Sequence, residues 1–177
     1  MLTTDRLILR APKADDTAAL HAVNHLNWPR VGNRLRTPDE HRAMIDEQAA
    51  KAPGTPGWHQ FVADRADTGA VIGGVAVNIG GPGERQAEIG YSFHPDSCGH
   101  RYGPEAVARV LTHLFDDQQL HRVIAITSVD NRPSRRLLER LGFRLEAETV
   151  ESFYHHAEGH FVDEVSYAML ARDWAQR

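Results

Sequence analysis

The segment that decides the fold is Ala87-Glu88-Ile89-Gly90-Tyr91-Ser92-Phe93-His94-Pro95, which leads through a turn into a stretch ending at Phe115. Apolar and polar residues alternate over 87–94, so the pattern predicts a β-strand with one apolar face and one face available for chemistry. Pro95 is expected to end this strand. Beyond the turn, apolar residues recur at helical spacing and predict a helix packed on a sheet: Val107, Val110, Leu111, Leu114 and Phe115.

The turn between this strand and helix reads Cys98-Gly99-His100-Arg101-Tyr102-Gly103-Pro104-Glu105 and is predicted to bind an anion. The first N–H groups of a helix lack partners inside the helix, and the helix dipole adds positive charge there. Gly99 and Gly103 permit the close approach that a phosphate needs, and Pro104 suits a first helical turn. The same residues also fit an ordinary connection. The phosphate motifs of ATPases and of dinucleotide-binding folds are absent.

Outward from this segment, the chain alternates between strand and helix patterns. Asn27-Trp28-Pro29 is expected to end a first helix, and Thr37-Pro38-Asp39-Glu40 to begin a second one as a capping box. The run 71–79 is expected to pair antiparallel with 87–94. Further strands are predicted at 6–10, 58–64, 122–129, 144–150 and 161–170, with a short helix at 133–141 and a polar connection between the last two strands.

The bulk composition limits the classes of protein. The chain has 177 residues, 41% hydrophobic and 25% charged, and we expect one globular domain over residues 1–177. A formal net charge of -4 does not favour nucleic acid as a partner. No stretch resembles a membrane span or a signal peptide, so we expect a cytoplasmic protein without a membrane partner. The single cysteine and the scattered histidines favour no metal site.

Five segments, in order, resemble GNAT N-acetyltransferases and, among them, the RimJ/RimL-like group that includes acetyltransferases of ribosomal-protein N-termini. The resemblance implies an α/β (α+β) fold, in which a mixed and mostly antiparallel central sheet is flanked by helices. A splayed pair of parallel strands holds the CoA arm in this fold. The segments are 2–10, 87–91, 102–106, 130–134 with Gly142-Phe143, and 159–163 continuing to Trp174.

The resemblance also implies that the turn binds the pyrophosphate of acetyl-CoA through backbone amides. The family pattern Arg/Gln-x-x-Gly-x-Gly/Ala reads here as Cys98, Gly99, His100, Arg101, Tyr102 and Gly103. Arg101 stands where the family has a glycine, so its guanidinium could pair with phosphate or its side chain could obstruct the turn. The resemblance further places the cofactor arm near Ser92, Phe93 and His94, and a cofactor contact at Asn131. Phe93 is equally compatible with the core, and Asn131 with a helix cap.

The chemistry implied is attack by a neutral amine on a thioester, which needs a base for the amine and a proton donor for the thiolate. Many relatives carry a tyrosine donor at the position of Leu138 here, so Ser134, the serine of the RimL-like group, is the candidate donor. It could equally be a serine that only begins a helix. Glu88 and His155 (or its neighbour His156) are the candidate bases, against a reading as solvated side chains.

The resulting expectation is an enzyme that moves an acetyl group from acetyl-CoA to a primary amine of a protein N-terminus or of a small molecule. An aminoglycoside or polyamine acetyltransferase is one alternative. A CoA-binding module with weak or lost catalysis is another, because Arg101 and Leu138 depart from the family pattern. The resemblance is also compatible with a homodimer.

Overall fold

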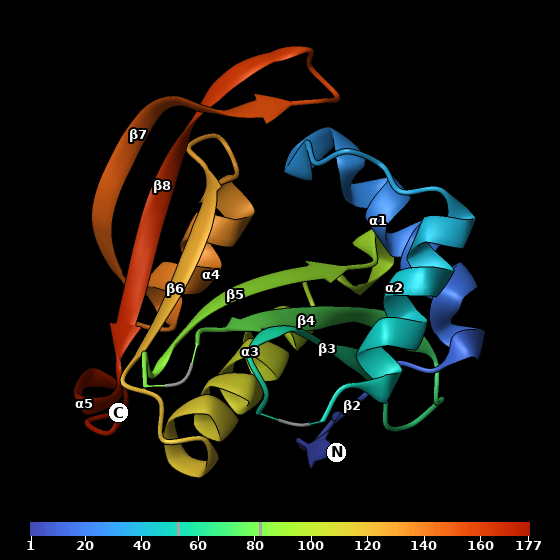
Figure 1. Cartoon of the computed structure of the whole chain (residues 1–177), viewed down its shortest axis with the longest axis horizontal. Coiled ribbons are helices and arrows are strands. Elements are labelled where there is room, and N and C mark those ends of the chain that lie inside the picture. The colour runs from blue at the N-terminus through green and yellow to red at the C-terminus, as the bar shows by residue number, and fades with distance from the viewer. Residues whose placement is uncertain (53, 82) are drawn as a thin grey trace.

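One eight-stranded sheet forms the centre of the protein in the computed structural model, which describes residues 1–52, 54–81 and 83–177 (Figure 1). Its strand order is β1-β2-β3-β4-β5-β6-β8-β7, and all neighbouring pairs are antiparallel except β5 with β6. The predicted mixed and mostly antiparallel sheet is therefore confirmed. The strands are β1 (Leu2–Thr3), β2 (Leu7–Arg10), β3 (Gly57–Arg65), β4 (Val71–Ile79), β5 (Gln86–Phe93), β6 (Arg122–Ser128), β7 (Arg144–His155) and β8 (His160–Leu170).

Helices cover both faces of the sheet. Neighbouring residues of a strand point to opposite faces of the sheet. In β3, Val62 packs in a cluster with Leu20 of α1 and Ile45 of α2. The next residue, Ala63, belongs to the main core, which includes residues of α3 and α4. The helices are α1 (Thr17–Val31), α2 (Pro38–Ala50), α3 (Tyr102–Thr112), α4 (Arg132–Arg140) and α5 (Ala171–Trp174), with short turns η1 (Ala14–Asp16), η2 (Pro95–Ser97) and the π-helical η3 (His113–Asp117).

The predicted helix after the turn is confirmed as α3, which η3 extends. Val107, Val110, Leu111 and Leu114 are almost completely buried, as the apolar stripe predicts. The capping box before α2 is also present, since the Thr37 side chain accepts from the Glu40 N–H and the Glu40 side chain accepts from the Thr37 N–H. None of the helices in the described residues is long and apolar enough to cross a membrane.

The predicted break at Asn27-Trp28-Pro29 is wrong, because α1 continues through Pro29 to Val31. A proline inside a helix removes the hydrogen bond to the carbonyl four residues earlier. Here that carbonyl belongs to His25, which is exposed, so water can replace the lost donor. Gly32 ends the helix instead, in the left-handed conformation with φ of 67°.

The predicted polar connection between the last two strands is mostly strand. β7 runs to His155 and β8 begins at His160, so the hairpin is longer than the predicted segments 144–150 and 161–170. Register shifts between Leu145 and Ala147 and between Thr149 and Phe153 accompany its bend. In Figure 1 the tip of this hairpin reaches over towards the end of α1.

The parallel strands β5 and β6 diverge after a short common stretch. They pair only from Gln86 with Arg122 to Glu88 with Ile124, although β5 continues to Phe93 and β6 to Ser128. Figure 1 shows the two strands leaving a shared end and separating, with α4 beside β6. The predicted splayed pair is therefore present, and it opens the middle of the sheet.

Candidate active site

A cleft of about 1060 Å³ lies where β5 and β6 diverge, between these strands and the helices α1 and α2. The strands supply polar side chains to it, and the helices supply aromatic and basic ones. Its lining includes Trp28, His41, Glu88, Tyr91, Ser134 and Glu164.

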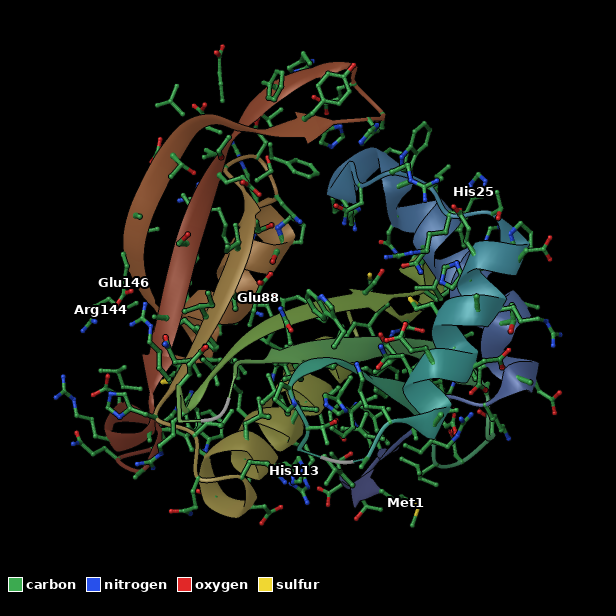
Figure 2. The ribbon with its side chains drawn as sticks, in the orientation of Figure 1. Met1, His25, Glu88, His113, Arg144 and Glu146 are labelled. Atoms are coloured by element: carbon green, nitrogen blue, oxygen red, sulfur yellow. The ribbon has the colours of Figure 1, made fainter. Side chains whose placement is uncertain are left out.

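Glu88 projects into this cleft from the last residue pair that joins β5 to β6 (Figure 2). Burial raises the pKa of its carboxyl, and the nearby Glu164 carboxylate raises it further. A carboxylate with a raised pKa is a better proton acceptor than an ordinary glutamate. Glu88 therefore lies in the cleft with a raised proton affinity, and its role as a general base stays a prediction.

Ser134 lies across the opening from Glu88's strand, in the first turn of α4. Its Oγ is 2.9 Å from the Tyr91 hydroxyl, which also lies 3.2 Å from the Ser134 carbonyl oxygen. Burial raises the pKa of Tyr91 to about 12, although the hydrogen bond with Ser134 acts in the opposite direction. The Tyr91 hydroxyl has a single proton, which it gives either to the Ser134 carbonyl or to Ser134 Oγ; in the second case the serine hydroxyl is left to donate into the cleft. The structure thus brings the predicted donor to the cleft and adds Tyr91 as its partner.

Asn131 is the N-cap of α4, and its side-chain oxygen accepts from the Ser134 N–H at 3.4 Å. It also lines the cleft, where its amide group is available. The capping role is therefore observed, and it leaves room for the predicted cofactor contact.

The backbone of β5 faces the opening at its last residues. The His94 N–H donates to the Ile72 carbonyl of β4 at 2.8 Å. The backbone N–H and C=O groups of successive strand residues point alternately to the two neighbouring strands. The backbone groups of Tyr91 and Phe93 therefore point to the side that β6 leaves open. Asn27 of α1 occupies one of them, because its Nδ2 donates to the Phe93 carbonyl at 2.9 Å.

The three predicted residues at the end of β5 have different environments. Ser92 lines the cleft, and its buried Oγ has no hydrogen-bond partner among the described residues. The Phe93 ring packs on the core and near Gly103. His94 caps η2, where its Nδ1 accepts from the Asp96 N–H at 3.2 Å. Of the three, Ser92 has a polar group left over for a ligand.

The turn before α3 presents a row of backbone amides. In the described part of the chain no acceptor is bonded to the N–H groups of Gly99, His100, Arg101, Tyr102 and Gly103. Successive N–H groups at a helix start, with left-handed residues among them, form a concave site for anions. Gly99 and Arg101 have φ of 82° and 63°. The residues present therefore fit the pyrophosphate of a CoA molecule.

Three side chains of this turn, those of Cys98, His100 and Tyr102, have neighbours outside that row. Cys98 is exposed, and its Sγ lies 3.9 Å from the His94 carbonyl oxygen. The His100 ring stacks on Tyr102 with centroids 5.8 Å apart, and Tyr102 in turn lies under the guanidinium of Arg6. Gly103 has no room for a side chain without movement of Leu137, whose Cδ1 would be 3.2 Å from an added Cβ.

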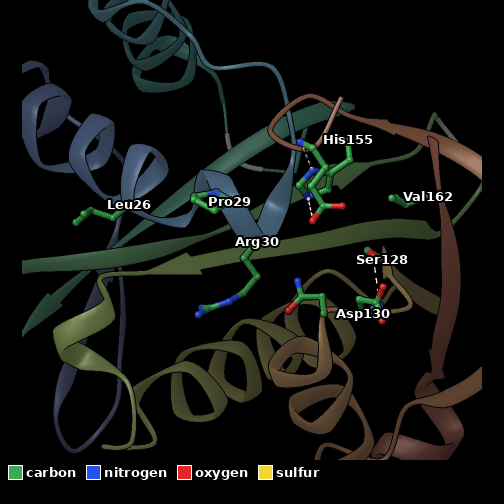
Figure 3. A pocket seen from close by; sticks show the side chains of 9 residues that line it. Leu26, Pro29, Arg30, Ser128, Asp130, His155 and Val162 are labelled. Atoms are coloured by element: carbon green, nitrogen blue, oxygen red, sulfur yellow. Dashed lines mark hydrogen bonds and ion pairs between the residues drawn. The ribbon is translucent and has the colours of Figure 1, made fainter. Parts of the chain in front are cut away.

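A smaller cavity of about 370 Å³ adjoins the cleft and contains His155 (Figure 3). Arg30, Ser128 and Asn131 line both spaces. His155 is almost fully buried, its Nδ1 accepts from the Glu158 N–H at 3.2 Å, and its ring lies against Gly32. These contacts join the β7–β8 hairpin to α1 and do not bring His155 beside Glu88 in the larger cleft. Its role as a base stays a prediction.

Sequence reasoning missed two residues that shape the site, Asn27 and Arg6. Asn27 occupies a position of the α1 stripe with Leu20 and Val23, and a polar residue on an apolar stripe was the available signal. Arg6 contacts Glu105, 99 residues away, so no local pattern could have paired them. Within the described ranges, no group of three or more His, Cys, Asp or Glu residues could hold a metal ion.

Comparisons with known proteins agree with this geometry. The acetyltransferase (GNAT) domain family matches residues 6–144. The curated protein YoaA of Bacillus subtilis (strain 168), named an uncharacterized N-acetyltransferase, is 29% identical over 159 residues, which are 88% of this chain and 89% of YoaA.

Solved structures share the fold at low identity. A spermidine N-acetyltransferase from Vibrio cholerae, in complex with CoA and spermine, has a TM-score of 0.85 and 22% identity, covering 97% of this chain and 99% of that one. The ribosomal-protein-S5-alanine acetyltransferase from Vibrio fischeri has a TM-score of 0.79 and 21% identity, with 97% of each chain covered. Both likenesses show that the fold is shared.

The fold and the matching family define this protein as an N-acetyltransferase that depends on acetyl-CoA. The chain belongs to the GNAT acetyltransferase family. The family predicted from the sequence is thereby confirmed.

Proposed function

We propose that this protein transfers the acetyl group of acetyl-CoA directly to a primary amine, with Glu88 as general base and Ser134 as proton donor. The observation that carries the proposal is the placement of both side chains in the same cleft, which opens between β5 and β6. Bound acetyl-CoA would supply a thioester, whose carbonyl carbon accepts the amine and whose sulfur leaves as a thiolate. No metal and no covalent enzyme intermediate are part of this proposal.

The cofactor would be held by the amides of the turn and by the open edge of β5. Residues 99–103 would bind the pyrophosphate, and the backbone of Tyr91 and Phe93 would bind the pantetheine amides. Ser92 and Asn131 offer polar side-chain groups to this path, since both line the cleft. His94, Cys98 and Arg101 border the same path, and their part in binding stays a prediction.

Glu88 would take the proton of the incoming amine, directly or through a water molecule. A protonated amine has no free electron pair, so this step makes the acceptor a nucleophile. Ser134 would give its proton to the departing sulfur, and Tyr91 keeps the serine oriented through their 2.9 Å hydrogen bond. Both steps use side chains whose positions are fixed by β5 and α4.

The pair of carboxylates in the cleft favours an acceptor that arrives as a cation. Glu164 is close enough to Glu88 for its charge to raise the pKa of the Glu88 carboxyl. A polyamine is the acceptor class that this observation and the spermidine acetyltransferase likeness support. A protein N-terminus is the other class, supported by the ribosomal-protein acetyltransferase likeness.

A thiol-release assay with acetyl-CoA and a panel of amines tests the activity. The panel contains spermidine, an aminoglycoside, free amino acids and peptides with free N-termini. Calorimetry with CoA runs in parallel. Binding of CoA without turnover of any amine would favour a binding module, and absence of CoA binding would contradict both assignments.

Replacing Glu88 by Gln tests the base. We expect kcat to fall by roughly 100-fold or more, since a positioned base typically contributes that much, while CoA affinity is unchanged. Glu47→Gln is the matched control, because Glu47 lines the same cleft but pairs with Lys51 at 3.5 Å. Equal kcat values for the Glu88→Gln variant and the wild type would rule out Glu88 as the base.

A further inference from the structure

Arg6 connects the beginning of the chain to the anion-binding turn. Its Nε donates to the Glu105 carboxylate at 2.8 Å, and its Nη1 donates to the His100 carbonyl at 3.0 Å. The same guanidinium lies over the Tyr102 ring, 4.7 Å from its centroid. One side chain just before β2 thus contacts three residues in or directly beside the turn.

Glu105, in the first turn of α3, is held from several directions. The Thr4 hydroxyl and the Arg6 N–H donate to its Oε1, and the Arg6 guanidinium binds its Oε2. Burial raises the pKa of Glu105, but the hydrogen bonds from Thr4 and Arg6 outweigh burial and leave it below the usual range. Glu105 is therefore an anion beside a site for another anion. Arg6 balances that charge.

The hydrogen bond to the His100 carbonyl sets the direction of an amide. In a trans peptide the C=O and the N–H point in opposite directions, and no described peptide bond is cis. Because Arg6 holds the His100 carbonyl, the Arg101 N–H must point away from Arg6. The Cys98 carbonyl is bonded to His100 Nδ1 at 3.0 Å, so the Gly99 N–H points away from the His100 ring.

We propose that Arg6 is a positioning residue for acetyl-CoA, which presets the turn 98–103 so that its amides face the pyrophosphate. The inference rests on the proposed binding of acetyl-CoA at this turn and extends it to a residue outside the turn. Arg6 itself points to the opposite side and does not touch the cofactor. It acts through the His100–Arg101 peptide and by neutralising Glu105.

A role in stability alone does not account for these contacts. The Arg6 side chain is 46% exposed, and ion pairs with that much exposure contribute little to folding. Its loss should therefore leave the fold in place and change the affinity for a phosphate-bearing donor. The test needs a readout that separates the two effects.

The experiment compares Arg6→Gln with wild type on two acyl donors. Acetyl-CoA carries the pyrophosphate, whereas acetylpantetheine has the same thioester and arm without it. Each donor is assayed by thiol release with the amine from the panel that gives the highest rate, and CoA affinity is measured by calorimetry. Arg65→Gln is the control, because Arg65 also lies near the Tyr102 ring, at 5.9 Å, but pairs with Asp67 instead of the turn.

For Arg6→Gln we expect the KM for acetyl-CoA and the Kd for CoA to rise about tenfold, because the Arg101 amide is no longer preset and the Glu105 charge is no longer balanced. The kcat, the KM for the amine and the rate with acetylpantetheine should stay at wild-type values. Arg6→Lys should fall between the two, since an ammonium keeps the charge but not the forked geometry.

Three outcomes would overturn the inference. An equal loss on both donors would mean that Arg6 supports the whole fold. An unchanged KM for acetyl-CoA would mean that the amides of the turn are oriented without Arg6, while the proposed function would stand. If wild type itself does not prefer acetyl-CoA to acetylpantetheine, the turn does not bind pyrophosphate, and that part of the proposed function fails as well.

Discussion

The carboxyl of Glu88 connects the local environment of one residue to a measurable pH dependence. Its pKa is raised by burial and by Glu164, so it loses its proton at a higher pH than an ordinary glutamate, whose pKa is 4.5. A base works only when deprotonated. We therefore expect kcat/KM to fall as the pH decreases, with the midpoint of this acid limb above pH 4.5. Glu164→Gln should move the acid limb to lower pH.

A pH–rate profile measured with an amine that is uncharged at neutral pH would detect this loss of activity at low pH.

The raised pKa of Glu88 also affects stability. The folded state disfavours the charged carboxylate, so deprotonation of Glu88 lowers the free energy of unfolding. The contribution of Glu88 to stability is present below pH 4.5 and is lost as the pH rises through its folded-state pKa. At pH 7, Glu88→Gln should accordingly unfold at higher denaturant concentration than wild type. An acid limb that does not move in Glu164→Gln would contradict the coupling.

Arg101 adopts a backbone conformation that suits glycine. Its φ of 63° is left-handed, which costs a residue with a side chain roughly 1 kcal/mol. Arg101→Gly should therefore raise the free energy of unfolding by about 1 kcal/mol, measured by urea titration.

Arg101→Ala separates the backbone from the guanidinium, because alanine keeps the Cβ and removes the charge. If CoA affinity is level or tighter in both variants, Arg101 is no phosphate ligand. A large loss in both variants would show that it has become one.

At the scale of elements, local patterns predicted most strands and helices, and the errors have physical reasons. The stripe of α3 and the capping box of α2 are decided within a few residues, so the sequence alone was sufficient. The end of α1 depends on Gly32 more than on Pro29. β7 is exposed along nearly its whole length, so no apolar alternation marked its second half.

For the site, the sequence predicted residues but not their partners. Glu88 and Ser134 could be named from family segments, whereas the Tyr91–Ser134 hydrogen bond joins two elements that only the fold brings together. The Arg6–Glu105 pair has the same character, since the two residues are far apart in the chain. Local sequence patterns do not contain such long-range contacts.

The contact between α1 and the β7–β8 hairpin gives a test at this scale. A Cβ at Gly32 would lie 2.2 Å from the His155 ring, and the φ of Gly32 is +67°. Gly69 has nearly the same φ, +70°, with nothing within 4 Å of an added Cβ. Gly69→Ala should cost about 1 kcal/mol of stability, and Gly32→Ala a further 1–3 kcal/mol from the clash.

Urea titration of both variants measures the difference directly. The double variant Gly32→Ala with His155→Ala should recover most of the extra cost, because the small side chain leaves room. Equal losses for Gly32→Ala and Gly69→Ala would show that the hairpin does not press on α1.

At the scale of the whole molecule, the continuous sheet predicts one cooperative unit. Strands from both ends of the chain belong to it, since β1 and β8 lie in the same sheet. We expect circular dichroism and tryptophan fluorescence to report a single unfolding transition, with Trp28 in α1 and Trp174 in α5 changing together. Acetyl-CoA at 100 times its Kd should add about 2.7 kcal/mol.

Two separate transitions would contradict the prediction that residues 1–177 form one domain. The predicted homodimer also belongs to this scale and stays a prediction. β7 lies at the end of the strand order and carries exposed apolar side chains, of which Val150 is 78% exposed.

The divergence of β5 and β6 has a consequence for the protein without its cofactor. Strand edges with unpaired backbone groups attract other extended chains, and natural sheets usually keep such edges short, charged or covered. Here the edge lies in the middle of the sheet, beyond Glu88, and α1 covers only part of it, where Asn27 donates to the Phe93 carbonyl. A pantetheine arm would cover it much as a further strand would. Saturation with CoA should therefore slow amide exchange at Tyr91 and Phe93 and protect the purified enzyme from aggregation.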